Sequence, residues 1–174
     1  MPKKGEKHSS DTIRKISMSR RGKPAWNKNI SWKDINKRKM SIGRRGVFNW
    51  IKEKNLRDML IRDYATAVMC EEQELYKPAI ILYSALLEAI LLYKLKIENI
   101  NFSKLIKKAQ ENKLVSVSNA NKLNVLRDFR NYIHINKELK SSYNLTKGTA
   151  EFAKEICESV FAEINEKQGG KSLS

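Results

Sequence analysis

The residues best suited to chemistry lie in one stretch, RDFRNYIH, which runs from Arg127 to His134. A histidine can transfer a proton near neutral pH, and an arginine can hold a phosphate as charge develops on it. The stretch therefore either acts on nucleic acid or forms the polar side of an ordinary helix. In the second case, Arg127, Arg130 and His134 would pair with Glu88 and with backbone carbonyls, and tie the fold together.

A helix over residues 118–134, starting from a Ser118 or Asn119 cap, would position these side chains. The spacing of three and four places four polar residues on one stripe of that helix: Arg127, Arg130, Asn131 and His134. An apolar arc lies opposite and is expected to be buried: Val125, Leu126, Phe129, Tyr132 and Ile133. Leu123 falls on the polar stripe, so the two sides are not fully separated.

The rest of the chain from residue 55 onward also has helical spacing of apolar residues, with no alternating strand pattern. We expect helices near 55–75, 78–97, 102–112 and 118–134, and a last one from a Thr146 or Asn144 cap to about residue 166. Helix 78–97 is apolar almost all round and should be central. Glu88 within it needs a partner, and Arg127 and Arg130 are the candidates. The sequence thus predicts an all-α, up-down bundle of five helices over residues 55–168, followed by a flexible tail at 169–174.

Two cysteines, Cys70 and Cys157, lie far apart with no metal-like spacing. They are expected to be small core residues in a reducing, cytoplasmic protein. The longest apolar stretch, AIILYSALLEAILLYKL, is interrupted by Glu88 and Lys94, and it indicates a core helix rather than a membrane span. The sequence points to no metal, cofactor or membrane.

Positive charge is concentrated at the beginning of the chain. The formal net charge is +16, and residues 1–55 hold 17 lysines and arginines against 4 acidic residues. Such a concentration usually meets a polyanion, which at this point means DNA, RNA or an anionic membrane. Residues 1–54 are therefore expected to form a basic arm joined to a nearly balanced body.

The arm contains a repeat. RKISMSRRG (14–22) and RKMSIGRRG (38–46) share six of nine residues, and each indicates a short helix closed by a glycine, Gly22 or Gly46. Neither unit can bury a core of its own, so a helix this basic needs a charged partner. All three tryptophans lie in the arm or at its end. We expect Trp50 to fix the arm to the body, and we leave Trp26 and Trp32 open between that role and packing against sugar or base.

The first unit resembles the short nuclease-associated modular DNA-binding motif of GIY-YIG and HNH homing endonucleases. KHSSDTIRKISMSRRGKPAWNKN (7–29) matches it at Lys7, His8, Ser9, Thr12, Lys15, Ile16, Ser17, Arg20, Arg21, Gly22, Trp26, Asn27 and Lys28. Asn29 stands where the motif usually has glycine. The second unit keeps Lys39, Ser41, Arg44, Arg45 and Gly46. The resemblance implies an extended element that lies along DNA, in the minor groove.

The physical chemistry of these side chains agrees, because lysine and arginine neutralise phosphates, arginine suits a narrow minor groove, and hydroxyl groups add phosphate contacts. The alternative is a solvated basic tail. The candidate nucleic-acid ligands are the motif positions Lys7, His8, Ser9, Lys15, Ser17, Arg20, Arg21, Trp26, Asn27, Lys28, Lys39, Ser41, Arg44 and Arg45, together with Arg14, Lys23 and Arg38. The chain has neither a GIY…YIG pair nor enough histidines for an HNH site.

The body resembles a HEPN domain (higher eukaryotes and prokaryotes nucleotide-binding), on the order of YKPAIILYSALLEAILLYKL, LIKKA and LRDFRNYIH. Arg127 and His134 have the family's spacing, whereas Ile135 stands where many relatives have proline. The resemblance implies a homodimer and, in many members, a metal-independent ribonuclease. His134 would then be the general acid or base. The scissile phosphate would be held by Arg127, by Arg130, or by both, and Asn131 would orient one of these side chains.

The sequence as a whole therefore predicts a DNA-binding protein, of mobile-element or phage type by resemblance, with a dimeric body that is a candidate metal-independent ribonuclease. The alternative is a non-enzymatic, DNA-tethered module for dimerisation or regulation.

Overall fold

The computed structural model describes residues 32–133 and 145–167 of the chain. Contacts divide the chain into a first unit, residues 1–31, and a second unit, residues 32–174. The first unit, His134 and the tail at 169–174 lie outside the described residues, and so do the candidate DNA ligands from Lys7 to Lys28. The described residues form helices joined by turns, with no strand among them, which confirms the expected all-α fold class. Their helices are α2 (Trp32–Arg45), α3 (Lys54–Glu72), α4 (Tyr76–Leu95), α5 (Phe102–Glu111), α6 (Val117–Tyr132) and α8 (Lys147–Glu166).

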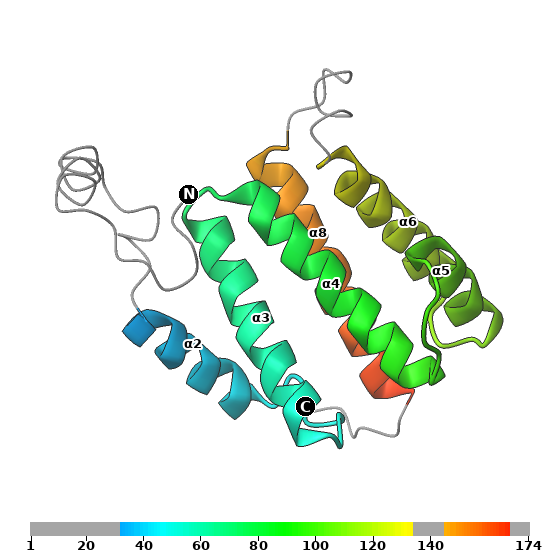
Figure 1. Ribbon diagram of the computed structural model, residues 1–174, viewed down its shortest axis with the longest axis horizontal. Helices are drawn as coiled ribbons and strands as arrows, with labels where there is room; N and C mark the ends of the chain where they lie inside the picture. Colours follow the sequence, from blue (N-terminus) through cyan, green and yellow to red (C-terminus); the bar gives the residue numbers. More distant parts are fainter. Residues whose placement is uncertain (1–31, 134–144, 168–174) are drawn as a thin grey trace, which may run out of the picture. The chain divides into compact units, whose positions relative to one another are not determined.

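Helix α4 is the centre of the second unit, as its apolar composition predicts. It packs against α3 on one side, against α5 and α6 on the other, and against α8 behind (Figure 1). Its large buried side chains include Ile80, Tyr83, Leu87, Ile90 and Leu91, and burying each such side chain contributes roughly 1.5–3 kcal/mol. The two cysteines, Cys70 on α3 and Cys157 on α8, are free thiols and are buried, as expected.

The length and composition of α4 would also suit a membrane span. With 20 residues and few charges, α4 is long and apolar enough to cross a membrane, although Glu88 and Lys94 interrupt its apolar stretch. A core helix of a soluble protein meets the same criterion, and less than half of the most apolar part of α4 is buried in the fold. The apolar surface of α4 is therefore only partly covered by the other described helices.

Helix α2, which contains most of the second copy of the repeat, packs along α3. Its Ile42 is buried, and the turn that follows buries Phe48 and Ile51 in the core shared by α3, α4 and α8. The Phe48 ring meets Phe161 edge-on, with ring centroids 5.1 Å apart. Contacts join residues 32–54 to the helical unit, because three apolar side chains anchor the second copy of the repeat on its core.

Gly46 ends α2 as the repeat predicts. Its φ of +69° lies in the left-handed region, and a Cβ atom there would approach the Asn49 side chain to 2.7 Å.

The predicted N-terminal cap is correct for α8 and displaced for α6. Thr146 caps α8, as expected, and its backbone N–H donates to Thr149 Oγ1 at 3.3 Å. The cap of α6 is Ser116, two residues before the predicted Ser118, and its hydroxyl accepts from the Asn119 N–H.

Candidate functional site

The side of α6 that faces the core differs from the predicted one. Its buried side chains are Asn119, Ala120, Leu123 and Leu126. Of the apolar arc expected inside, Leu126 is buried and Phe129 and Ile133 pack against the core, but Val125 and Tyr132 are 40% and 37% exposed. Because α6 packs against α4, α5 and α8, its buried side is centred on Leu123, the residue that fell on the polar stripe.

This orientation turns Arg130 toward α4. Its Nη1 donates to Glu88 Oε2 at 2.5 Å, so Arg130 is the partner that Glu88 required. The guanidinium carbon also lies 6.0 Å from the centre of the Phe102 ring on α5. Arg130 thus links α6 to two neighbouring helices, while 40% of its side chain stays exposed.

Arg127 contacts polar groups on its own helix and on α5. Its Nη1 donates to Asn124 Oδ1 at 2.8 Å and to Ser103 Oγ at 3.1 Å, and its Nη2 donates to Asp128 Oδ1 at 2.9 Å. Its side chain is 28% exposed. Asn131 lies one turn further on and is half-buried. The structure therefore places Arg127, Arg130 and Asn131 at the C-terminal half of one helix, with both arginines already hydrogen-bonded.

Among the candidate DNA ligands, the described ones lie on α2. Lys39 is half-buried, Ser41 is exposed, and Arg38 forms an ion pair with Glu72 at the end of α3. Arg44 and Arg45 belong to the last turn of α2, and their side chains lie outside the described part of the structure. Lys33 and Lys37, which are exposed on the same helix, were not singled out from the sequence.

Sequence reasoning also missed a group of cations where the chain passes from α2 to α3. Trp50 packs against the core as predicted, and its Nε1 donates to the Val47 carbonyl at 3.0 Å. Lys94, at the end of α4, holds its Nζ 4.3 Å from the centre of the Trp50 ring and 5.4 Å from that of Tyr93. Arg57 donates from Nη1 to the Ile51 carbonyl at 3.4 Å.

Lys52 completes this group, because it directly follows Trp50, whose ring contacts Lys94, and Ile51, whose carbonyl accepts from Arg57, and its positive charge acts on Lys94. We call Lys52, Arg57 and Lys94 the cationic corner. Burial and the charge of Lys52 hold the pKa of Lys94 below its ordinary value. The density of positive charge near Lys52 and Lys54 was visible in the sequence, but Lys94 is about forty residues away and only packing brings it there.

An open cavity of about 960 Å³ adjoins the cationic corner. Its apolar wall comes from Leu56, Leu92 and Ile97, and its polar lining comes from Glu53, Tyr93, Lys94, Lys96, Glu98 and Asn99. The cavity lies between the beginning of α3 and the end of α4. Its volume exceeds that of two other hollows on the described surface, which measure about 290 and 300 Å³.

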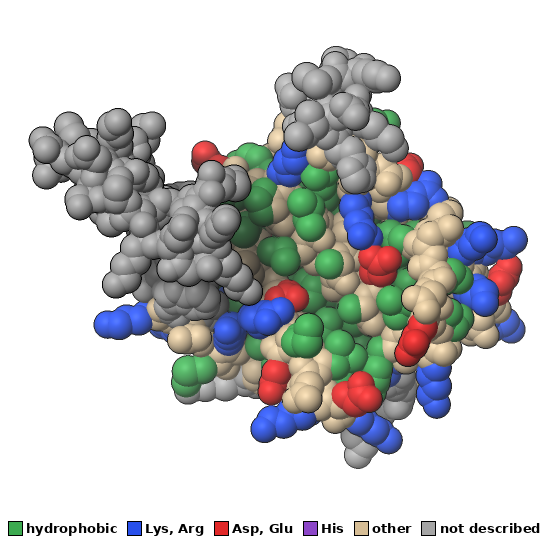
Figure 2. Space-filling model, in the orientation of Figure 1, with side chains coloured by type: hydrophobic (Ala, Val, Ile, Leu, Met, Phe, Trp, Pro, Cys, Tyr) green, Lys and Arg blue, Asp and Glu red, His purple; other side chains and the backbone are tan. Residues whose placement is uncertain are grey.

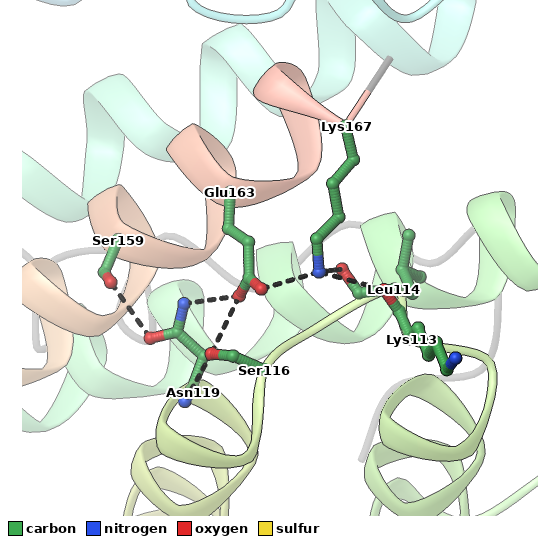
Figure 3. Close-up of polar contacts among 7 residues, drawn as sticks. All are labelled: Lys113, Leu114, Ser116, Asn119, Ser159, Glu163 and Lys167. Carbon is green, nitrogen blue, oxygen red and sulfur yellow. Dashed lines mark hydrogen bonds and ion pairs between the residues drawn. The ribbon is translucent and has the colours of Figure 1, made fainter.

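A second polar network, which we call the α6–α8 clamp, has a different character (Figure 3). Glu163 on α8 accepts from Asn119 Nδ2 at 2.7 Å, from Ser116 Oγ at 3.2 Å and from Lys167 Nζ at 2.7 Å. Lys167 Nζ also donates to the Lys113 carbonyl at 2.9 Å, and Ser159 Oγ donates to Asn119 Oδ1 at 2.9 Å. Partial burial opposes ionisation of Glu163, but these hydrogen bonds and the Lys167 charge outweigh it and lower its pKa.

The clamp is a structural network, because each of its donors meets an acceptor and it joins the start of α6 to the end of α8. The α6 arginines and the cationic corner remain as candidate sites for a ligand. Comparison of the chain with models of known protein families, with curated proteins and with solved structures finds no match.

Proposed function

We propose that this protein binds duplex DNA through its basic N-terminal part, residues 1–54. The observation that carries the proposal is the division of α2 into two sides. Ile42 is buried against the core, whereas Lys33 and Lys37 are exposed. Six of the 14 residues of α2 are lysine or arginine and one is acidic, so anchoring on α3 leaves a basic surface directed away from the core.

The preceding 31 residues extend this basic character. They hold nine lysines and arginines against two acidic residues, and they contain the first copy of the repeat. A backbone of regularly spaced phosphates is a ligand for repeated basic elements, since each cation that neutralises a phosphate releases a counterion. A solvated basic tail would not require the second copy to be fixed to a folded core.

The experiment is fluorescence anisotropy with a labelled DNA duplex at several salt concentrations. Two variants, Arg20→Ala/Arg21→Ala and Arg44→Ala/Arg45→Ala, should each weaken binding and flatten its dependence on salt, because each removes two phosphate ligands. Lys108→Ala/Lys122→Ala, with the same change of charge on α5 and α6, is the matched control. If a chain that lacks residues 1–31 and carries Arg44→Ala/Arg45→Ala binds DNA as well as the whole protein, the proposal fails.

The helical unit itself serves as a dimerisation module in this proposal. Support comes from the partly covered surface of α4, where hydrophobic side chains gather in the middle of the face shown in Figure 2. Ile81, two turns before Glu88 on that helix, is 41% exposed, and Ala85, one turn before Glu88, is also exposed. A second copy of the chain would cover this apolar surface and the adjoining Arg130.

Light scattering of the whole protein tests the dimer. We expect a dimer at tens of micromolar, where interfaces of standard size hold. Ile81→Glu should convert it to a monomer with unchanged helicity, whereas Asn121→Glu, which adds the same single negative charge at an exposed position of α6, should not. A wild-type protein that is monomeric at this concentration contradicts the proposal.

A second candidate function is RNA cleavage by the helical unit. It is supported by the partial exposure of Arg127 and Arg130 on one side of α6, three residues apart, beside Asn131. In this reaction the RNA 2′-hydroxyl attacks the adjacent phosphorus, the bond to the 5′-oxygen breaks, and a 2′,3′-cyclic phosphate remains. His134 would move the proton, and Arg127 or Arg130 would hold the phosphate. DNA lacks the attacking hydroxyl and is not cut.

Gel assays with labelled RNA in EDTA test this candidate. Cleavage should persist without metal and should fall by on the order of 10²–10⁴ in His134→Ala, the size of a lost proton transfer. Arg127→Ala should also abolish it, while Lys122→Ala should leave it unchanged. Circular dichroism and light scattering check that the variants keep wild-type folding and assembly. If folded wild-type protein does not cut RNA, the non-enzymatic DNA-tethered module is the function.

A further inference from the structure

The cationic corner gathers positive charge that the fold itself does not neutralise. Lys52 follows directly after the buried Ile51, Arg57 is held at the Ile51 carbonyl, and Lys94 is held over the Trp50 ring. Within residues 32–133 and 145–167, none of the three forms an ion pair with a carboxylate. By contrast, Arg38, Arg127, Arg130, Lys154 and Lys167 all do.

The position of Lys94 makes its charge costly in the free protein. Burial removes part of its hydration, and the like charge of Lys52 repels it. The cavity beside it adds Lys96 on the positive side and Glu53 and Glu98 on the negative side. The cavity lining is thus balanced, with Lys94 and Lys96 against Glu53 and Glu98, and Lys52 and Arg57 add two cations beside it that form no ion pair with a described carboxylate. An anion that enters between Lys52 and Lys94 would relieve their repulsion.

We propose that Lys52, Arg57 and Lys94 form a phosphate-binding site on the helical unit, which takes the sugar–phosphate backbone of the same DNA that residues 1–54 bind. This inference rests on the proposed function. It extends the DNA-binding surface from the repeat onto the end of α4, which is nearly forty residues beyond the basic segment.

Continuity along the chain favours a DNA phosphate over other anions. Arg44 and Arg45 end α2, and the chain reaches Lys52 seven residues after Arg45 through the turn that Phe48 and Ile51 anchor. A rigid anchor of this kind fixes where the corner lies relative to the end of α2. A helix end and a cationic corner held at a constant separation match a ligand whose charges repeat, and such a pair gains affinity because little ordering of the backbone is needed on binding.

The test measures DNA affinity of the full chain against salt concentration, with Lys52→Gln/Lys94→Gln as the variant. The matched control is Lys108→Gln/Lys122→Gln, which removes the same charge from α5 and α6. Loss of two phosphate contacts should reduce the slope of log Kd against log salt concentration by about 1.8, and the control should leave the slope nearly unchanged. Lys94→Arg keeps a cation at the ring and should retain the slope.

The outcomes separate this inference from the proposed function. Wild-type binding with equal slopes for the variant, the control and the wild type overturns the corner site and leaves DNA binding by the repeat intact. Absence of wild-type binding to the duplex overturns both. If Lys52→Gln/Lys94→Gln loses helicity, the single change Lys52→Gln at its exposed position replaces it, with an expected reduction of about 0.9. An unchanged slope in that variant counts equally against the site.

Discussion

Two lysines at different places in the fold, Lys167 in the α6–α8 clamp and Lys94 in the cationic corner, have opposite surroundings. Lys167 Nζ donates to Glu163 and to the Lys113 and Leu114 carbonyls. Lys94 Nζ lies over two aromatic rings, and the positive charge of Lys52 acts on it. The clamp uses a charge to hold helices together, whereas the corner keeps charges that no described carboxylate pairs with. The presence or absence of a carboxylate partner thus distinguishes Lys167, which stabilises the fold, from Lys94 and Lys52, which we propose are available to a ligand.

The α6 arginines lie between these extremes. Arg130 has a carboxylate partner in Glu88 and retains a partly exposed guanidinium. The ion pair therefore joins α6 to α4, while part of the Arg130 guanidinium remains accessible to a ligand. The pairing weakens the case for a catalytic arginine pair and strengthens the case for a structural role, and separate measurements of stability and of RNA cleavage can distinguish the two.

The largest change in the free energy of unfolding should come from removing Glu163, the shared acceptor of the α6–α8 clamp. Glu163→Ala removes the acceptor shared by Ser116, Asn119 and Lys167, and it leaves the buried Asn119 amide without its carboxylate. We expect the free energy of unfolding to fall by about 2–3 kcal/mol. Urea denaturation measures the change. Glu166→Ala, an exposed residue on the same helix end, should have almost no effect, and equal losses in both variants would contradict the assignment of the clamp.

The Arg130–Glu88 pair should contribute less, because 40% of the arginine side chain is exposed to solvent. Arg130→Ala should lower the free energy of unfolding by about 1 kcal/mol. A double-mutant cycle with Glu88→Ala isolates the coupling, which we expect to be about 0.5–1 kcal/mol. A coupling of zero would mean that Arg130 does not depend on Glu88 and is available to a ligand. Arg130 would then resemble the lysines of the cationic corner rather than those of the clamp.

Acid should weaken the clamp by less than the deletion of Glu163 does, since protonation removes a charge but leaves the carboxyl group in place. The pKa of Glu163 is lowered in the folded state, so its stabilising contribution is complete above its ordinary value of 4.5 and is lost as pH falls through the lowered one. Denaturation at a series of pH values should show a loss of stability in this window that is smaller in Glu163→Gln. A parallel pH dependence of both proteins would refute the assignment.

The smallest change in the free energy of unfolding should come from removing the charge repulsion within the cationic corner. Lys52→Gln removes the like charge that acts on Lys94, and it should raise the free energy of unfolding by about 0.2–0.5 kcal/mol at low salt. The gain should disappear near 1 M salt, where the screening length is about 3 Å. A loss of stability on this substitution would show that Lys52 already has a compensating partner, and that the corner resembles the clamp.

The spacing of apolar residues was enough to predict an all-helical chain, the central position of α4 and the left-handed glycine that ends α2. These features follow from local periodicity and from the backbone preference of a single residue. The face of α6 was predicted less well. Val125 and Tyr132 belong to the most apolar arc of that helix and are nevertheless exposed, because α4 and α5 pack against the side that holds Leu123 and Arg130.

The sequence by itself determined which residues could form helices, where the positive charge is concentrated, and that Glu88 needs a cation. Only the tertiary structure decided that Arg130 supplies this cation and that Lys94 joins Lys52 and Arg57. The physical reason is that residue type and spacing fix the faces of a single helix, whereas the rotation of each helix about its axis depends on how several neighbours fill the core together. Charges far apart in the chain meet only after that packing is settled.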